Sequence, residues 1–243
     1  MSAEKLDQLL RPLMRTAQRL DLRPDAGAKE GGVLTKFGGL PFAAKGELWP
    51  VCPRCRQDLI FIYQFVVETT ESLFVFFYCM ECSPWGLADE ARGMWVLRRY
   101  ESPCMDQYGP ISPAEPLLFN VVPCSVARHT VTVLPDWEGL DTASEEPALL
   151  CGKLNATAPW DVYAEAQHRL GCWDEYATIL GGYPRWVQGE VIVPCPKCQS
   201  DLEFLGQIDS EEKANIMWGD CGLIYLFLCP DHPDEIHMEL QCY

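Results

Sequence analysis

The stretch "FGGLPFAAKGELWPVCPRCRQDLIFIYQ", residues 37–64, combines a Gly-Gly-x-Pro turn, a Cys-x-x-Cys pair and an apolar run that ends in glutamine. A second stretch, "LGGYPRWVQGEVIVPCPKCQSDLEFLGQ", residues 180–207, carries the same features in the same order 143 residues later. The two stretches align without a gap over 28 positions, of which 12 are identical. Such self-similarity marks an internal repeat, and this period is too long for a solenoid. We therefore expect a duplicated fold with approximate two-fold symmetry between its halves.

The repeat continues downstream in short apolar runs. "LFVFFYCMEC" at 73–82 aligns with "IYLFLCPDH" at 224–232 once about seven extra residues are allowed in the second copy. Aromatic and β-branched runs of this length predict buried strands. "LFNVVPCSVARHTVTVL" at 118–134 predicts further strands in the connection between the copies.

A helix is expected upstream of each copy. In the first, five apolar residues fall on one helical face: Leu6, Leu9, Leu10, Leu13 and Met14. In the second, "PWDVYAEAQHRLGCWDEYATIL" at 159–180 is the counterpart, which Gly181 and Gly182 would end as a helix C-terminus. The acidic, turn-rich segment 138–148 is the expected seam between the halves.

These elements predict a strand-rich α+β fold with internal duplication. Residues 1–145 would form the first repeat and residues 146–243 the second, and the two would pack as one globular unit. Each repeat would contain a helix, the Gly-Gly-x-Pro turn, a zinc-ribbon-like knuckle and strands.

The cysteine spacing predicts a metal site in the first repeat. Two Cys-x-x-Cys pairs separated by two strands place four thiolates around one Zn²⁺ ion, as in a zinc ribbon. The four ligands would be Cys52, Cys55, Cys79 and Cys82.

The second repeat predicts a similar site with one ligand exchanged. His232 falls where the alignment places Cys82, and imidazole commonly replaces thiolate at structural zinc sites. The predicted ligands are Cys195, Cys198, Cys229 and His232, with Cys221 and His237 as rivals for the fourth place. The remaining cysteines lack partners at ligand spacing, and we expect them to pack as small apolar residues: Cys104, Cys124, Cys151, Cys172 and Cys242.

The net charge and hydropathy of the chain limit the kinds of molecule that it can bind. The chain of 243 residues has a formal net charge of -16, and Arg98-Arg99 is its only adjacent basic pair. Nucleic acid is therefore disfavoured as a direct partner, whereas the charge suits a basic protein partner or simply an acidic, soluble surface. The sequence has no apolar run long enough for a membrane span and no apolar targeting segment at its N-terminus, so we expect a cytoplasmic protein.

Nothing in the sequence predicts an enzyme. A catalytic zinc generally keeps an open coordination position, whereas both sets here supply four protein ligands. His129, His168 and His237 have no serine or cysteine motif beside them, and no phosphate-binding glycine loop occurs.

Several motifs resemble the bacterial YwqG-like family, whose function is largely undefined. They are "TKFGGLPF", "WPVCPRC", "LGGYPRWVQ", "LEFLGQID" and "MWGDCGLIYLF". The string Gly-Gly-Tyr-Pro-x-Trp-x-Gln at 181–188 is quite specific. Many members of that family lack the cysteine pairs, so the zinc prediction rests on this sequence. YwqG-like proteins have been linked with immunity against polymorphic toxins.

The cysteine-containing pattern is also similar to the eukaryotic programmed-cell-death-protein-two family, which chaperones a basic ribosomal protein. The matching residues are Leu59, Phe61 and Gln64 in the first copy and Leu202, Phe204 and Gln207 in the second. The glycine usual in that family after the second knuckle cysteine is replaced by Arg56 and Gln199 here. Both resemblances imply an interaction protein without naming its partner.

Two functions from different classes therefore remain open, beside a structural stress or housekeeping domain with no separable site. The first is a zinc-stabilised cytoplasmic module that binds a basic protein, as an immunity protein or a chaperone would. The alternative is an enzyme or small-ligand binder with a cleft between the repeats, lined by Gln64, Gln207, Trp186, Gln188 and Asp220. The two glutamines could instead hydrogen-bond strand backbone near the repeat axis.

Overall fold

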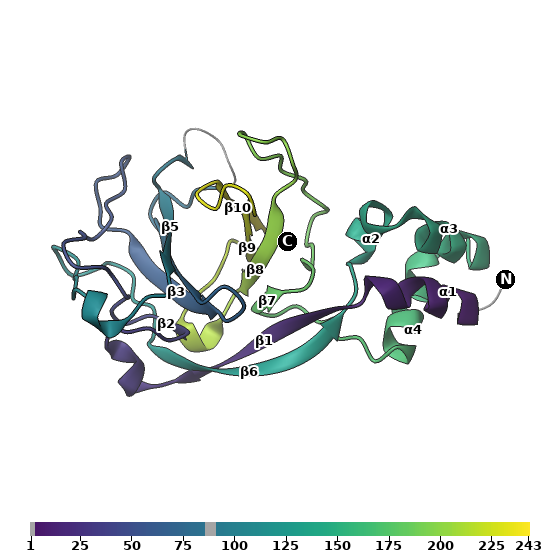
Figure 1. The fold of residues 1–243 in the computed structure, drawn as a ribbon, viewed down its shortest axis with the longest axis horizontal. Helices are drawn as coiled ribbons and strands as arrows, with labels where there is room; N and C mark the ends of the chain where they lie inside the picture. The colour runs from purple at the N-terminus through teal and green to yellow at the C-terminus, as the bar shows by residue number, and fades with distance from the viewer. Residues whose placement is uncertain (1–2, 86–90) are drawn as a thin grey trace. The chain divides into compact units, whose positions relative to one another are not determined.

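The computed structural model describes residues 3–85 and 91–243 (Figure 1). They form two compact units, each assembled from separate stretches of chain. Unit 1 comprises residues 1–20, 128–210 and 218–243, and unit 2 comprises residues 21–127 and 211–217.

Unit 2 is built on an antiparallel sheet with the strand order β6-β2-β3-β4-β5. Its strands are β2 (Lys36–Phe37), β3 (Ile60–Val67), β4 (Ser72–Tyr78), β5 (Trp95–Glu101) and the first part of β6 (Cys124–Val133). Short 3₁₀ turns lie at Ala26–Lys29, Met105–Gln107 and Glu212–Ala214. β4 is buried along its whole length, as its continuous aromatic and β-branched sequence predicts. The core on one face of this sheet includes Phe42, Trp49, Leu59, Phe61, Val75, Phe77 and Met94.

Unit 1 combines the other strands of the ten-stranded antiparallel sheet with a group of helices. The strand order is β10-β9-β8-β7-β1, formed by β1 (Arg15–Pro24, its first part), β7 (Ile179–Gly181), β8 (Glu203–Asp209), β9 (Leu223–Leu228) and β10 (Ile236–Gln241). The helices α1 (Ala3–Leu10), α2 (Trp137–Ala143), α3 (Glu145–Leu154) and α4 (Pro159–Arg169) lie together (Figure 1). The strand-rich α+β class predicted from the sequence is thus confirmed.

The helices differ from expectation in three respects. First, the two predicted helices do not serve separate halves, because α1 and α4 share one core in unit 1, where Leu6 packs with Tyr163. Second, the expected seam at 138–148 is helical, since Asp136 caps α2 by accepting the Trp137 N–H at 2.8 Å. Third, α4 ends at Arg169, and Gly181 instead closes strand β7.

The boundaries of the units also differ from the predicted division at 145/146. The N-terminal segment belongs to unit 1 because Ala17 and Arg19 of β1 pair with Gly181 and Ile179 of β7. Strand β6 likewise begins in unit 2, where Cys124 pairs with Phe37, and continues into unit 1. Long-range strand pairing, and not sequence order, therefore decides which segments fold together.

Of the helices formed by the described residues, none has the length and hydropathy that a membrane-spanning helix requires.

Candidate metal centres

Four cysteines converge at one end of the β3–β4 pair in unit 2. Cys52 and Cys55 precede β3, whereas Cys79 and Cys82 directly follow β4, so antiparallel pairing of these strands brings both pairs together. The Cys52 and Cys82 Sγ atoms lie 3.8 Å apart, and those of Cys55 and Cys79 lie 3.6 Å apart. We call this group the four-cysteine centre.

A second group occupies the matching end of the β8–β9 pair in unit 1. Cys195 and Cys198 precede β8, and Cys229 and His232 follow β9. His232 Nδ1 lies 3.7 Å from Cys195 Sγ and 3.6 Å from Cys229 Sγ, and the Cys198 and Cys229 sulfurs are 3.6 Å apart. We call this group the cysteine–histidine centre.

These separations have the dimensions of a tetrahedral metal site. A tetrahedral ion with metal–sulfur bonds of about 2.3 Å and a metal–nitrogen bond of about 2.05 Å places two sulfurs about 3.8 Å apart and sulfur and nitrogen about 3.6 Å apart. A disulfide would require about 2.05 Å between sulfurs, and all 13 cysteines are free. In each group, all four ligand atoms lie within 4.8 Å of one another. Both groups can therefore hold a metal ion, as predicted.

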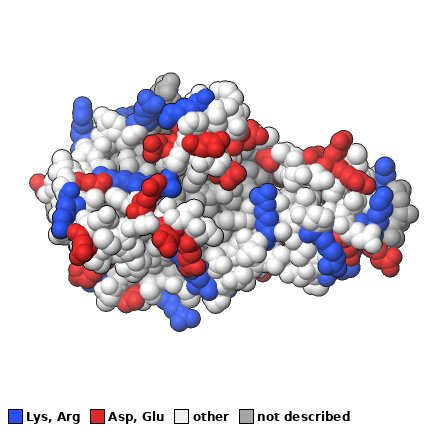
Figure 2. All heavy atoms as spheres, in the orientation of Figure 1, with Lys and Arg blue, Asp and Glu red and all other residues white. Residues whose placement is uncertain are grey.

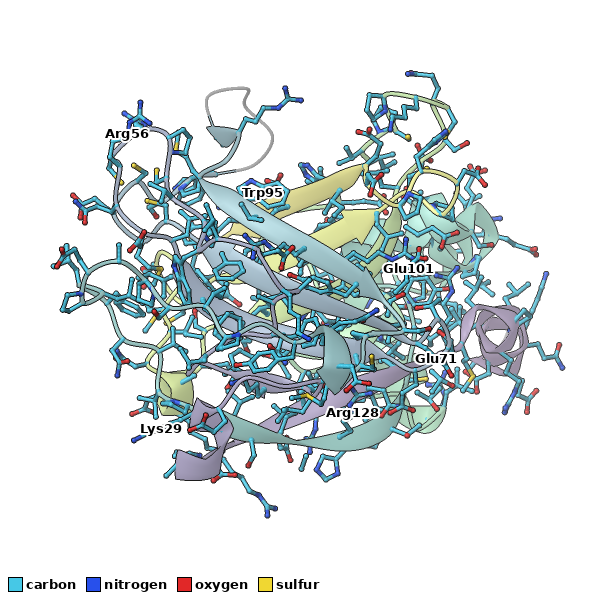
Figure 3. All side chains as sticks on the ribbon, turned by 60° about the vertical axis from the view of Figure 1, so that its left-hand side comes forward. Lys29, Arg56, Glu71, Trp95, Glu101 and Arg128 are labelled. Carbon is cyan, nitrogen blue, oxygen red and sulfur yellow. The ribbon has the colours of Figure 1, made fainter. Side chains whose placement is uncertain are left out.

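Tight backbone turns hold the first pair of cysteines in each centre. The Arg56 N–H donates to the Cys52 carbonyl at 3.0 Å, and the Gln199 N–H donates to the Cys195 carbonyl at 2.8 Å. Arg56 and Gln199 have φ values of +65° and +63°, a left-handed conformation that favours glycine. This conformation explains why glycine would be preferred there. Figure 3 shows Arg56 at the tip of its loop, directed away from the sheet.

The local electrostatics differ among the thiols. Burial raises the pKa of Cys52, but the backbone N–H groups of Cys55 and Arg54 outweigh it and lower the pKa to about 7. Hydrogen bonds from Ser200 lower the pKa of Cys198 to about 6. Burial raises the pKa of Cys79 and of Cys229. Each centre thus pairs a thiol whose pKa is lowered by hydrogen bonds with one whose pKa is raised by burial.

The two rivals for the fourth ligand lie outside the cysteine–histidine centre. Cys221 is exposed in a turn with φ of +53°. His237 is buried on β10 opposite Phe227, with its Nε2 atom 3.3 Å from a Glu239 oxygen. Of the cysteines without ligand spacing, Cys104 is exposed, and the others are buried: Cys124, Cys151, Cys172 and Cys242.

Gln64 and Gln207 are buried and bonded to backbone within their own units. The Gln64 carbonyl oxygen accepts the Phe42 N–H at 2.8 Å, and its amide group donates to the Gly32 and Leu34 carbonyls at 2.7 Å each. The Gln207 oxygen accepts the Arg185 N–H, and its amide group donates to the Ala177 carbonyl, both at 2.9 Å. These bonds favour the structural role that the sequence left open for the two glutamines.

The other residues suggested for a cleft lie in unit 1. Trp186 is buried against Tyr225 and Phe227. Gln188 donates to the Cys242 carbonyl at 2.6 Å, and the exposed Asp220 accepts the Tyr243 N–H through its backbone carbonyl.

Sequence reasoning missed a hydrogen bond that recurs at the same spacing of 143 residues. The Thr35 hydroxyl accepts the Val66 N–H, and the Thr178 hydroxyl accepts the Asp209 N–H, both at 3.1 Å. No clear sequence signal marks this bond, because threonine is the only identical residue where "TK" at 35–36 aligns with "TI" at 178–179. The β3–β4 and β8–β9 pairs also shift register at the same point, between Phe61 and Tyr63 and between Phe204 and Gly206.

The two strand sets differ at Lys36, which aligns with Ile179. Lys36 pairs with Gln64 in unit 2, where Ile179 pairs with Gln207 in unit 1. The Lys36 side chain is fully buried, and its Nζ donates to the Ala28 and Glu30 carbonyls at 2.8 and 2.7 Å. Burial lowers its pKa to about 8. Sequence reasoning did not identify this lysine, because charged residues are seldom fully buried.

A hollow beside the four-cysteine centre was also not anticipated. It is lined by apolar and acidic residues, among them Ile60, Glu81, Glu115 and Leu117. The segment 118–123 was predicted to begin a strand, but it belongs to an irregular loop that ends where β6 begins at Cys124.

A family model described as "Domain of unknown function (DUF1963)" matches residues 35–232. The chain is also similar to a curated relative, the "Uncharacterized protein YpfL" of Salmonella typhimurium (strain LT2), with 29% identity over 118 residues. This alignment covers 44% of the chain and 28% of the relative, so the chain spans well under two thirds of that protein's length. Neither description states an activity, and the resemblances to the YwqG-like and programmed-cell-death-protein-two families stay predictions.

Proposed function

We propose, from the premise that the chain belongs to the DUF1963 family of domains of unknown function, that it is a protein-binding scaffold stabilised by two structural zinc ions. The observation that carries this proposal is the pair of four-ligand groups. Each group joins the segment that precedes a pair of antiparallel strands to the segment that follows it. A site whose four positions are filled by protein has no place for a reacting water, so its role is to hold segments together.

Zinc is the ion that the donor sets favour. Thiolate and imidazole ligands in tetrahedral geometry select zinc over calcium, magnesium or manganese, which prefer oxygen ligands. Iron–sulfur clusters also use cysteine, but the sulfurs of such a cluster bind several irons and lie farther apart than those of a single-ion site. The separations of 3.6–3.8 Å in both centres suit one ion each.

We infer further that the strand sets β2–β3–β4 and β7–β8–β9 arose by duplication of one module. The sequence repeat and the repeated contacts support this inference: the knuckle turns, the threonine and glutamine hydrogen bonds, and the register shifts all recur 143 residues apart. A common evolutionary origin of the two copies explains why buried polar contacts are reproduced along with the apolar pattern. Lys36 in place of Ile179 shows where the copies have diverged.

Binding of a basic protein is the activity that the charge favours. The formal net charge is -16, which attracts basic partners and repels nucleic acid. On the face shown in Figure 2, acidic and basic side chains are interspersed and neither sign covers the face. A local site is therefore a better candidate for recognition than a broad acidic surface. Immunity against a toxin and chaperoning of a client are two forms of this proposed function, and a cytoplasmic location belongs to the same proposal.

The test is affinity capture with the full-length, metal-loaded chain at about 0.1 M and about 1 M salt, between which the Debye length falls from about 10 to about 3 Å. We expect a basic protein to be retained at low salt, to be released at high salt, and to bind again when both proteins are purified. Nuclease treatment should leave retention unchanged.

The matched control is the same chain after removal of the metal with a chelator, which should retain much less of the partner. Recovery of no protein that binds again in purified form would overturn the proposal, as would retention that depends on nucleic acid.

A further inference from the structure

We propose that the hollow beside the four-cysteine centre is a peptide-binding pocket that takes one large apolar side chain flanked by lysine or arginine. This inference deepens the proposed protein-binding function, on which it rests, by naming the site and the chemistry of the recognised segment. The pocket lies within unit 2.

Three segments form the walls of this pocket. They are the start of β3 with Ile60, the residues after β4 from Cys79 to Glu81, and residues 115–119 of the loop before β6. Six lining residues are apolar and lie outside the metal ligands: Ile60, Met80, Pro116, Leu117, Leu118 and Phe119. More than half of the lining residues are thus apolar, and the lining includes part of the segment from Cys79 to Cys82 that the metal centre would hold.

The loop that forms one wall is long but well anchored. Residues 109–123 contain no helix or strand, and irregular loops of this length in compact units commonly serve a function. Four prolines stiffen it: Pro110, Pro113, Pro116 and Pro123. The Ala114 N–H donates to an Asp58 carboxylate oxygen at 2.7 Å, and Leu117 packs on the buried core. A fixed wall lowers the entropy cost of binding.

The rim of the pocket is negatively charged. Glu81 and Glu115 are exposed, and neither forms an ion pair with another residue in the described ranges 3–85 and 91–243. Asp58 adds a third carboxylate, of which one oxygen is engaged by the loop. The described lining includes no lysine or arginine. A cationic group of a ligand at the rim would therefore be attracted to these carboxylates, whereas phosphate groups and acidic peptides would be repelled.

The size of the pocket favours a side chain over a small molecule. Its volume is about 270 Å³, below the range of about 300–1,000 Å³ in which drug-sized ligands usually bind. Leu118 is 86% exposed at its edge, beside the half-buried Leu117 and Phe119. A neighbouring hollow of about 530 Å³ shares Ile60, Leu117 and Phe119 with it, which gives an extended segment room to continue.

The test uses the full-length metal-loaded chain and capped peptides of sequence Gly-Lys-Phe-Lys-Gly, Gly-Glu-Phe-Glu-Gly and Gly-Lys-Gly-Lys-Gly. Amide NMR shifts are measured during titration with each peptide. We expect the lysine–phenylalanine peptide to shift the signals of Met80, Glu81, Leu117 and Leu118, and to bind at least tenfold more tightly than either of the others.

Two variants separate the charged and apolar parts of the pocket. Glu81→Gln with Glu115→Gln should weaken binding about fivefold, since each exposed ion pair contributes little alone. Leu118→Ser should also weaken it, without loss of folding because this side chain is already exposed. The matched control is Glu71→Gln with Glu101→Gln, which removes the same charge far from the centre and should leave binding unchanged. Figure 3 shows Arg56 and Glu101 near opposite ends of the β3–β4–β5 sheet.

Equal affinity for the three peptides, no shift of the four signals, or equal weakening by the control variant would overturn the pocket. A protein partner that binds the Glu81→Gln, Glu115→Gln variant as tightly as the unaltered chain would also overturn it, yet would leave the proposed protein-binding function standing.

Discussion

Replacement of Cys79 by serine is expected to remove one metal ion per chain and to lower the free energy of unfolding by about 5 kcal/mol or more. Cys79 directly follows β4 and is buried, and its sulfur lies 3.6 Å from that of Cys55. Loss of this thiolate opens the four-cysteine centre, so the loops at the end of the β3–β4 pair lose their common attachment. Zinc analysis and urea denaturation under reducing conditions measure the two effects.

The control is Cys124→Ser, which alters another buried cysteine of unit 2 that lies outside both metal groups. This variant should lose only about 1 kcal/mol and keep its full metal content. If Cys79→Ser retained the metal, or if both variants lost the same stability, the cysteines would serve as core packing and not as ligands.

Replacement of Gln64 by glutamate is the second large effect that we expect, a loss of about 3–5 kcal/mol in unfolding free energy at neutral pH. The Gln64 amide donates to the Gly32 and Leu34 carbonyls at 2.7 Å, in a site with no exposure to solvent. A carboxylate would place a buried negative charge against these two carbonyl oxygens. Gln207→Glu should have a similar effect in unit 1, because it removes the donor to the Ala177 carbonyl.

Urea denaturation of each variant measures this effect, with Gln107→Glu as the control. Gln107 is exposed, and its side chain acts as an acceptor for the Cys104 N–H, which glutamate can also do. The control should change stability by less than about 0.5 kcal/mol. An equally small change in Gln64→Glu would contradict the structural role and revive a binding role for the glutamine.

The two groups that can hold a metal ion could be predicted from the sequence because ligand spacing is local chemistry. Cys-x-x-Cys pairs place two thiolates in one turn, and two apolar runs after Cys55 and before Cys79 indicate the strand pair that joins them. The aligned position of His232 predicted the fourth member of the second group, and the structure places its Nδ1 atom 3.6 Å from the Cys229 sulfur. The buried strands β4 and β9 followed from their aromatic composition in the same way.

The arrangement of the chain could not be predicted in this way. Pairing of Gln18 with Leu180 joins residues far apart in the sequence and leaves no local pattern. Helix α2 was predicted as a turn because "EGLDTA" contains glycine and polar residues typical of turns. The helix is stabilised instead by its Asp136 cap and by burial of Leu140. The pocket was missed because "AEPLLF" at 114–119 resembles the start of a strand, until the bond from Ala114 to Asp58 and the packing of Leu117 are known.

The central claim is that each unit is held by one closed metal centre. The most direct measurement is the zinc content of the chain, purified under reducing conditions without added metal, by elemental analysis against protein concentration from amino-acid analysis. Two zinc ions per chain are predicted, one for each group of four ligands. A folded chain with one zinc ion would contradict the claim for one unit, and a folded chain with none would contradict it entirely.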